Sequence, residues 1–160
     1  MDLHFTYRPV DEASAREFLQ WKYDPPYELY NYSPDNFESD LAYHLDPDNN
    51  IFSMYKDEEL VGYCSFGQDA RVRGGDYAEP ALDIGLMIKP SLTGQGLGSD
   101  FVKNIVQYAI TEFQASKLRV TILESNLRAQ RVWEKNGFHK TSSFHRETDQ
   151  LPFVILTRDV

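Results

Sequence analysis

The stretch from Ile84 to Gly98 constrains the fold of this 160-residue chain most, because an apolar strand pattern leads through a glycine-rich turn into a strong helical pattern. The near-continuous apolar run predicts a strand over Ala81–Ile88 with both faces buried. Three alternate glycines fill the turn, and apolar residues then recur at helical spacing from Leu97 to Phe113. A strand, a tight turn and a helix in this order indicate an α/β domain.

The glycines of the turn suit the binding of a phosphate group. Without a Cβ, consecutive backbone N–H groups can point into one concavity, and the following helix N-terminus adds partial positive charge. The two common phosphate motifs do not fit, since Ser99 replaces the last glycine of the dinucleotide fingerprint and no G-x-x-x-x-G-K run occurs. The alternative is that these glycines form only a tight connection between strand and helix.

The remaining periodicities and turn signals predict one α/β domain over residues 1–160 with a mixed sheet. Helices are expected from a cap at Ser14, from Ser33-Pro34, after the glycine turn, and from a cap at Asn126. The expected strands are Leu3–Pro9, Ile51–Tyr55, Leu60–Phe66, Ala81–Ile88, Leu118–Leu123, Thr141–Phe144 and Phe153–Thr157.

Composition excludes several classes of protein. The chain has 16 Lys and Arg against 25 Asp and Glu, a net charge of −9, which argues against nucleic acid or an anionic membrane as a partner. No window reaches the ~18 apolar residues of a membrane span, and no apolar segment follows a basic start. We expect a soluble cytoplasmic protein without a bound metal. The lone Cys64 is expected in the core, and the four scattered histidines at the surface.

Two motifs resemble those of the GNAT superfamily of N-acetyltransferases. The family carries Gln or Arg, two variable residues, Gly, one variable residue, and Gly or Ala; here Thr93, Gly96 and Gly98 occupy these places after Ile88-Lys89-Pro90. The second motif is matched in spacing throughout, although tryptophan replaces its usual tyrosine. Its residues here are Asn126, Ala129, Trp133, Gly137 and Phe138.

The resemblance implies a mixed, mostly antiparallel sheet that splays at its central parallel pair and is flanked by about four helices. It also implies acetyl-CoA as acetyl donor, with the pyrophosphate in the glycine turn and the pantetheine arm along the open strand edge. The cofactor-binding residues expected from it are Met87, Ile88, Thr93, Gly94, Gln95, Gly96, Leu97, Gly98, Ser99, Asn126, Ala129 and Trp133.

Acetyl transfer to an amine needs a neutral amine, donors for the developing oxyanion and a proton for the thiolate. The resemblance makes a backbone N–H near Met87 or Ile88 the oxyanion donor, and we expect that of Met87. Asp83 shares a strand face with Met87 and is our candidate base, with Glu79 as second choice. The alternative for Asp83 is a solvated or ion-paired acid at the end of the strand. Trp133 cannot supply the proton that the usual tyrosine gives. Either another hydroxyl replaces it, or the thiolate leaves unassisted.

The aromatic loop after the first helix is the candidate acceptor site, because aromatic faces and a carboxylate suit a cationic amine. Packing of the loop onto the sheet is the alternative. We expect transfer of an acetyl group to a primary amine of a small molecule or peptide, or else a coenzyme-A-binding sensor without turnover. The oligomeric state, a homodimer included, stays open. The residues expected to set specificity are Trp21, Tyr23, Tyr27, Glu28, Tyr30 and Tyr32. Of these, the expected substrate-binding residues are Trp21, Tyr27, Glu28 and Tyr30.

Overall fold

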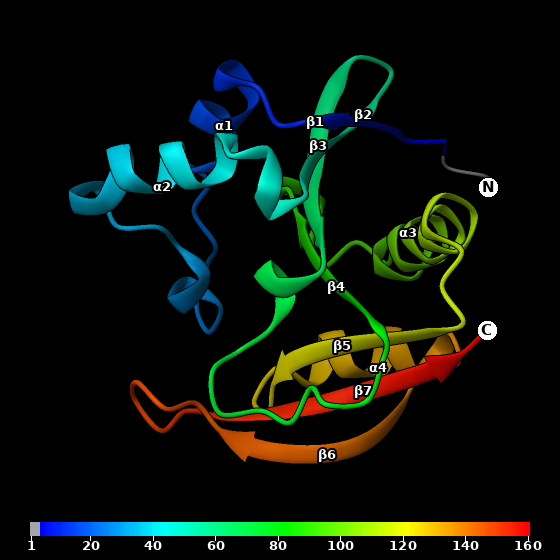
Figure 1. Ribbon diagram of the computed structural model, residues 1–160. Coiled ribbons are helices and arrows are strands. Elements are labelled where there is room, and N and C mark those ends of the chain that lie inside the picture. The colour runs from blue at the N-terminus through cyan, green and yellow to red at the C-terminus, as the bar shows by residue number, and fades with distance from the viewer. Residues whose placement is uncertain (1–3) are drawn as a thin grey trace.

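A computed structural model describes residues 4–160. In this part of the chain a seven-stranded mixed sheet has the strand order β1-β2-β3-β4-β5-β7-β6 (Figure 1). The strands are β1 Thr6–Pro9, β2 Ile51–Lys56, β3 Glu59–Phe66, β4 Leu82–Ile88, β5 Lys117–Leu123, β6 His139–His145 and β7 Pro152–Asp159. The α-helices are α1 Glu12–Phe18, α2 Phe37–Leu45, α3 Gly98–Phe113 and α4 Leu127–Lys135. The predicted mixed, mostly antiparallel sheet with four helices is confirmed.

Three element starts differ from the prediction by three residues, and the others differ by two or fewer. The α-helix expected from Ser33-Pro34 begins at Phe37, because Ser33 caps a 3₁₀ turn over Pro34–Asn36 instead. The first strand begins at Thr6, and Leu3, where it was expected to start, lies outside the described residues. Helix α1 is capped by Asp11 rather than Ser14, because the Asp11 carboxylate accepts a hydrogen bond from the Ser14 N–H at 2.8 Å. Asp11 and Ser14 therefore satisfy each other's backbone donors, and the helix begins one turn earlier.

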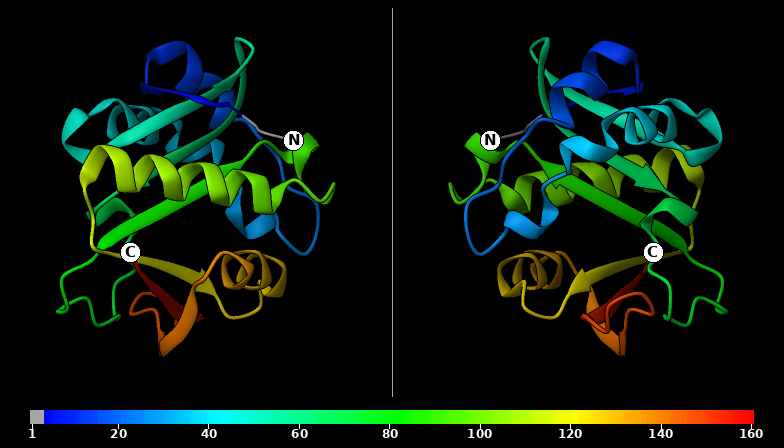
Figure 2. Two further views of the ribbon diagram at one scale, coloured as in Figure 1. Left: turned by 90° about the vertical axis from the view of Figure 1, so that its right-hand side faces the viewer. Right: turned by 90° about the vertical axis from the view of Figure 1, so that its left-hand side faces the viewer.

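The sheet splays between its only two parallel strands in the described chain. β4 and β5 pair at Leu82–Leu118 and Asp83–Arg119, although β4 continues to Ile88 and β5 to Leu123. Figures 1 and 2 show the two strands close together at one end and diverging toward their carboxyl ends. Beyond Asp83, the edge of β4 that faces β5 therefore has no strand beside it.

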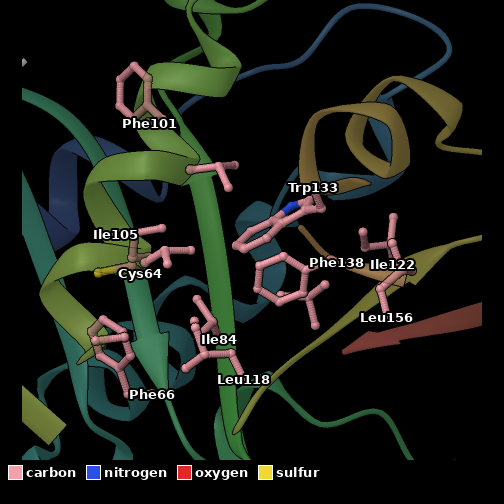
Figure 3. Close-up of a cluster of buried hydrophobic side chains, with 14 of the residues drawn as sticks. Cys64, Phe66, Ile84, Phe101, Ile105, Leu118, Ile122, Trp133, Phe138 and Leu156 are labelled. Carbon is pink, nitrogen blue, oxygen red and sulfur yellow. The ribbon is translucent and has the colours of Figure 1, made fainter. Parts of the chain in front are cut away.

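The two faces of β4 pack against different helices. Ile84, Leu86 and Ile88 join the cluster under α3 and α4, part of which is drawn in Figure 3. Met87 instead packs with residues of α1, α2 and β3. This alternation places Asp83 on the face of Met87, as the sequence predicted. The gap between β4 and β5 is thus bounded by α3 and α4 on one face, and α1 and α2 cover the other face of β4.

Candidate active site

A cavity of about 780 Å³ occupies the gap between β4 and β5. Its wall includes the facing parts of both strands, residues 84–88 and 120–123. One end reaches the glycine turn at the start of α3, and the other reaches α2 and β3. Its volume is within the ~300–1,000 Å³ of small-molecule sites, and its two ends differ in chemistry.

The backbone of β4 bonds alternately to β3 and to the cavity. Lys89 N–H donates to the Val61 carbonyl at 2.9 Å, and Gly67 N–H to the Asp83 carbonyl at 2.8 Å. These bonds and the continuous β3–β4 register orient the backbone groups of odd-numbered residues toward β3. The N–H groups of Leu86 and Ile88 therefore face the open edge, whereas that of Met87 does not. The expected oxyanion donor moves by one residue.

The glycine turn holds its backbone in the left-handed region, with φ 71° at Gly94 and 76° at Gly96. A Cβ at Gly96 would meet no atom within 4 Å, so open space lies over the turn. Leu97, which caps α3, offers no side-chain acceptor to the first-turn amides. Open space and uncapped amides fit a phosphate group.

Among the other predicted turn residues, Thr93 and Ser99 line the cavity, while Gln95 and Leu97 do not. The Thr93 hydroxyl donates to the Pro90 carbonyl at 2.7 Å and so closes its own turn. The Gln95 side chain donates to the Ser91 carbonyl, and Leu97 packs against the core. At this end of the cavity, Gln95 and Leu97 can therefore contribute only backbone groups to binding.

The start of α4 lies across the gap from the turn. The side-chain oxygen Oδ1 of Asn126 accepts from the Ala129 N–H at 3.1 Å, and the side-chain NH₂ of Asn126 donates to the Tyr30 hydroxyl at 3.0 Å. Ala129 and Trp133 also line the cavity. Trp133 is only 6% exposed and meets Phe138 edge-on at 5.0 Å (Figure 3). The indole is thus both core and cavity wall.

Arg128 supplies a charge that the sequence analysis missed. A Cβ placed on Gly94 would lie 3.7 Å from its Nη1, and its guanidinium stacks on the Tyr27 ring at 4.2 Å. The sequence contained a signal for Arg128, because a positive side chain in the first turn of a helix interacts unfavourably with the helix dipole. An arginine at this position therefore indicates another role. Lys135 of the same helix also lines the cavity.

A sequence model of the acetyltransferase (GNAT) domain matches residues 4–139 of the chain. The chain belongs to the GNAT family. It is similar to the probable N-acetyltransferase YjcK of Bacillus subtilis, with 31% identity over 106 residues. That match covers 66% of this chain and 53% of YjcK, so the chain spans about half the length of this relative.

Solved structures resemble the GNAT fold of this chain over nearly its whole length. The aminoglycoside acetyltransferase AAC(6')-Ib in complex with coenzyme A and kanamycin has a TM-score of 0.75 at 18% identity, covering 98% of this chain and 95% of its own. A chimera of spermidine N-acetyltransferase SpeG from Vibrio cholerae and hSSAT has a TM-score of 0.68 at 18% identity, covering 97% and 95%. At such identities the likeness establishes the fold.

Asp83 does not fit the predicted role of base in this GNAT chain. Its side chain is 1% exposed and does not line the cavity. Arg119 Nε and Nη2 bind its two carboxylate oxygens at 2.7 and 2.9 Å, and Arg71 Nε binds one of them at 2.8 Å. The hydrogen bonds to Asp83 raise the pKa of Arg119. The ion-paired alternative is what the structure contains, and Glu79 is exposed in a pair with Lys117.

The acceptor end of the cavity differs in part from the prediction. Tyr27 and Tyr30 line it, but Glu28 is exposed outside it and Trp21 packs in the core beside Tyr63. His44 was expected at the surface and is instead 6% exposed in the cavity wall. These side chains come from separate segments, so no local motif indicated them. The wall residues that the sequence analysis missed here are Asp40, Tyr43, His44, Tyr63 and Asp69.

Within residues 4–160, no group of three or more His, Cys, Asp or Glu side chains is arranged to hold a metal ion. No helix in this range is long and apolar enough to cross a membrane.

Proposed function

We propose that this chain is an acetyl-CoA-dependent N-acetyltransferase that acts on a primary amine of a small molecule or peptide. The open edge of β4 is the observation that carries the proposal. It offers the N–H groups of Leu86 and Ile88 to a cavity that joins a phosphate-binding turn to an acidic, tyrosine-rich end. Both halves of an acetyl-transfer site are thus present on one continuous surface.

The residues of the cavity fit acetyl-CoA, which would supply an activated thioester. The amides of the glycine turn and the guanidinium of Arg128 would hold the pyrophosphate. The N–H of Leu86 or Ile88 would polarise the carbonyl oxygen and stabilise the oxyanion. The Ile88 carbonyl is held by the Tyr23 hydroxyl at 2.7 Å, which fixes this end of the edge.

Tyr30 is our candidate for the proton donor to the leaving thiolate, because the indole of Trp133 cannot supply that proton. Its hydroxyl accepts from the Asn126 amide at 3.0 Å, so its own proton is available to another acceptor. Burial raises the pKa of Tyr30, which keeps the phenol protonated at neutral pH. The Tyr30 hydroxyl would then take the role of the tyrosine that the family usually has at the position of Trp133 in α4.

Structural neighbours suggest which amines to test, because they are an aminoglycoside acetyltransferase in complex with kanamycin and a chimera of a spermidine N-acetyltransferase. The test combines calorimetric titration with coenzyme A and thiol release from acetyl-CoA on spermidine, kanamycin and a peptide with a free N-terminus. Binding together with thiol release supports the proposal. Binding of coenzyme A without thiol release on any of these amines favours the alternative of a non-catalytic coenzyme-A-binding sensor, which the tryptophan at position 133 leaves open. No binding overturns both.

A further inference from the structure

Three side chains at the acceptor end form a hydrogen-bonded chain. The Tyr63 hydroxyl lies 3.2 Å from the Tyr32 hydroxyl, which lies 3.1 Å from Nε2 of His44. On the other side of the ring, His44 Nδ1 lies 2.7 Å from the Asp40 carbonyl oxygen. All four residues line the cavity.

The direction of the hydrogen bonds in this series follows from His44, its last member. A backbone carbonyl only accepts, so Nδ1 of His44 carries a hydrogen, and in neutral imidazole Nε2 is then an acceptor. Tyr32 must donate to Nε2, which leaves its oxygen to accept from Tyr63. The hydroxyl hydrogens of Tyr63 and Tyr32 therefore both point along the series toward His44.

The open end of the chain is the Tyr63 oxygen. Among the hydrogen bonds of the described residues, none donates to this atom, and Tyr63 lines the cavity with 7% of its surface exposed. Tyr63 lies opposite Met87 in the β3–β4 pairing and packs beside it. Adjacent strands are about 4.8 Å apart, so Tyr63 is one strand from the edge proposed to hold the thioester.

The groups that face His44 come from its own helix, from α1, from β3 and from the loop before α2. From its own helix, Asp40 offers its carbonyl and Tyr43 a ring at 5.5 Å, and Tyr43 in turn donates to Asp69 at 2.6 Å. From α1, the ring of Phe18 lies 5.2 Å from the imidazole. The remaining titratable neighbours are the hydroxyls of Tyr32 and Tyr63, from the loop before α2 and from β3.

We propose that Tyr63, Tyr32 and His44 form the proton relay that deprotonates the acceptor ammonium, and this inference rests on the proposed function. An ammonium N–H gives its proton to the Tyr63 oxygen, Tyr63 passes its own to Tyr32, and Tyr32 passes its own to His44 Nε2. The neutral amine attacks the acetyl carbon, the C–N bond forms, and the C–S bond breaks. Tyr30 gives its proton to the thiolate and takes the second amine proton in its place, and imidazolium releases the relayed proton to solvent.

Burial of the Tyr63 and Tyr32 hydroxyls suits groups that relay protons without ionising themselves. Desolvation raises the pKa of Tyr63 well above its usual value and also raises the pKa of Tyr32. Both phenols therefore stay protonated at neutral pH and can only hand on one proton as they receive another. Imidazole is the side chain that accepts a proton readily near neutral pH, so His44 suits the terminal position.

The test compares Tyr63→Phe and His44→Gln with the parent on whichever amine of the panel turns over fastest. Tyr63→Phe keeps the ring that stacks on Phe18 at 4.0 Å, so it removes the entry oxygen and leaves the packing. We expect kcat to fall by about 10²–10⁴ in both variants, with coenzyme A affinity within about twofold of the parent. Tyr55→Phe and His139→Gln, outside the cavity wall, should keep the parental kcat.

The pH dependence of kcat separates a relay from mere packing. The parent should lose activity as pH falls, because imidazolium cannot accept another proton, and His44→Gln should lose this acidic limb. An active parent whose Tyr63→Phe variant keeps kcat within twofold, or whose His44→Gln variant keeps the acidic limb, overturns the relay while the proposed function stands. A parent that releases no thiol on any amine overturns both.

Discussion

At the scale of single residues, Arg128 and not the first residue of the glycine motif brings a positive charge to the glycine turn. Thr93 stands where the motif has Gln or Arg, and its hydroxyl is bonded to the Pro90 carbonyl. Arg128 of α4 approaches the turn at Gly94 instead and stacks on Tyr27. Arg128 thus brings from another element a charge that Thr93 lacks. The sequence predicted the turn, but not this partner in α4.

Gly96→Val tests whether the turn binds phosphate. We expect the coenzyme A dissociation constant to rise at least about tenfold, or about 1.4 kcal/mol, because the side chain would fill the open space over the amides. Gly67→Val is the matched control, since Gly67 also has a positive φ and open space but lies outside the cavity wall. Each variant should lose about 1–3 kcal/mol of stability from backbone strain.

Calorimetry gives the affinity of these variants and urea denaturation gives their stability. If folded Gly96→Val binds coenzyme A as the parent does, or if Gly67→Val loses binding equally, the glycines serve only to turn the chain.

At the scale of elements, β4 shows what sequence patterning can and cannot predict. The apolar run predicted a strand over Ala81–Ile88, and the observed strand is Leu82–Ile88. Side-chain alternation gave the two faces correctly, because it depends only on the chain itself. Which backbone groups face the cavity depends on the register with β3, and register is set by partners distant in sequence. For that reason the sequence pattern does not distinguish Met87 from Ile88 as the donor.

Amide hydrogen exchange followed by NMR tests this assignment. In the free protein the N–H groups of Gly85 and Met87 should exchange slowly because they bond to β3, while those of Leu86 and Ile88 should exchange quickly. Saturating coenzyme A should slow Leu86 or Ile88 at least about tenfold. Gly85 and Met87 serve as controls within the same strand. Protection gained at Met87 alone would restore the original donor.

At the scale of the whole molecule, the site is assembled from segments that no local motif connects. The sequence indicated the cofactor end because the glycine turn and α4 each carry a contiguous motif. The acceptor end depends on Tyr32, His44 and Tyr63 meeting across a loop, a helix and a strand. Asp83 and Arg119 likewise meet only through the parallel pairing of β4 and β5. Such long-range partners follow from the tertiary fold, and a single sequence does not specify them.

The Asp83–Arg119 pair ties the two halves of the sheet at the point where they diverge. Only two residue pairs join β4 to β5 there, and the Arg119 side chain is 4% exposed. Asp83→Asn should lower the free energy of unfolding by about 3–5 kcal/mol, because it leaves the arginine buried with its charge uncompensated. Urea denaturation measures this loss. Glu12→Gln, which breaks the exposed pair with Arg16, should lower it by less than about 1 kcal/mol.

The same variant decides between the two roles considered for Asp83. If the carboxylate is structural, folded Asp83→Asn at saturating acetyl-CoA should keep kcat within about tenfold of the parent, since no proton passes through it. A base in its place would require a loss of about 10²–10⁴. A fall in kcat beyond a hundredfold with little change in stability would return Asp83 to the chemistry. A large fall in stability with kcat retained would assign it to the junction of the two half-sheets.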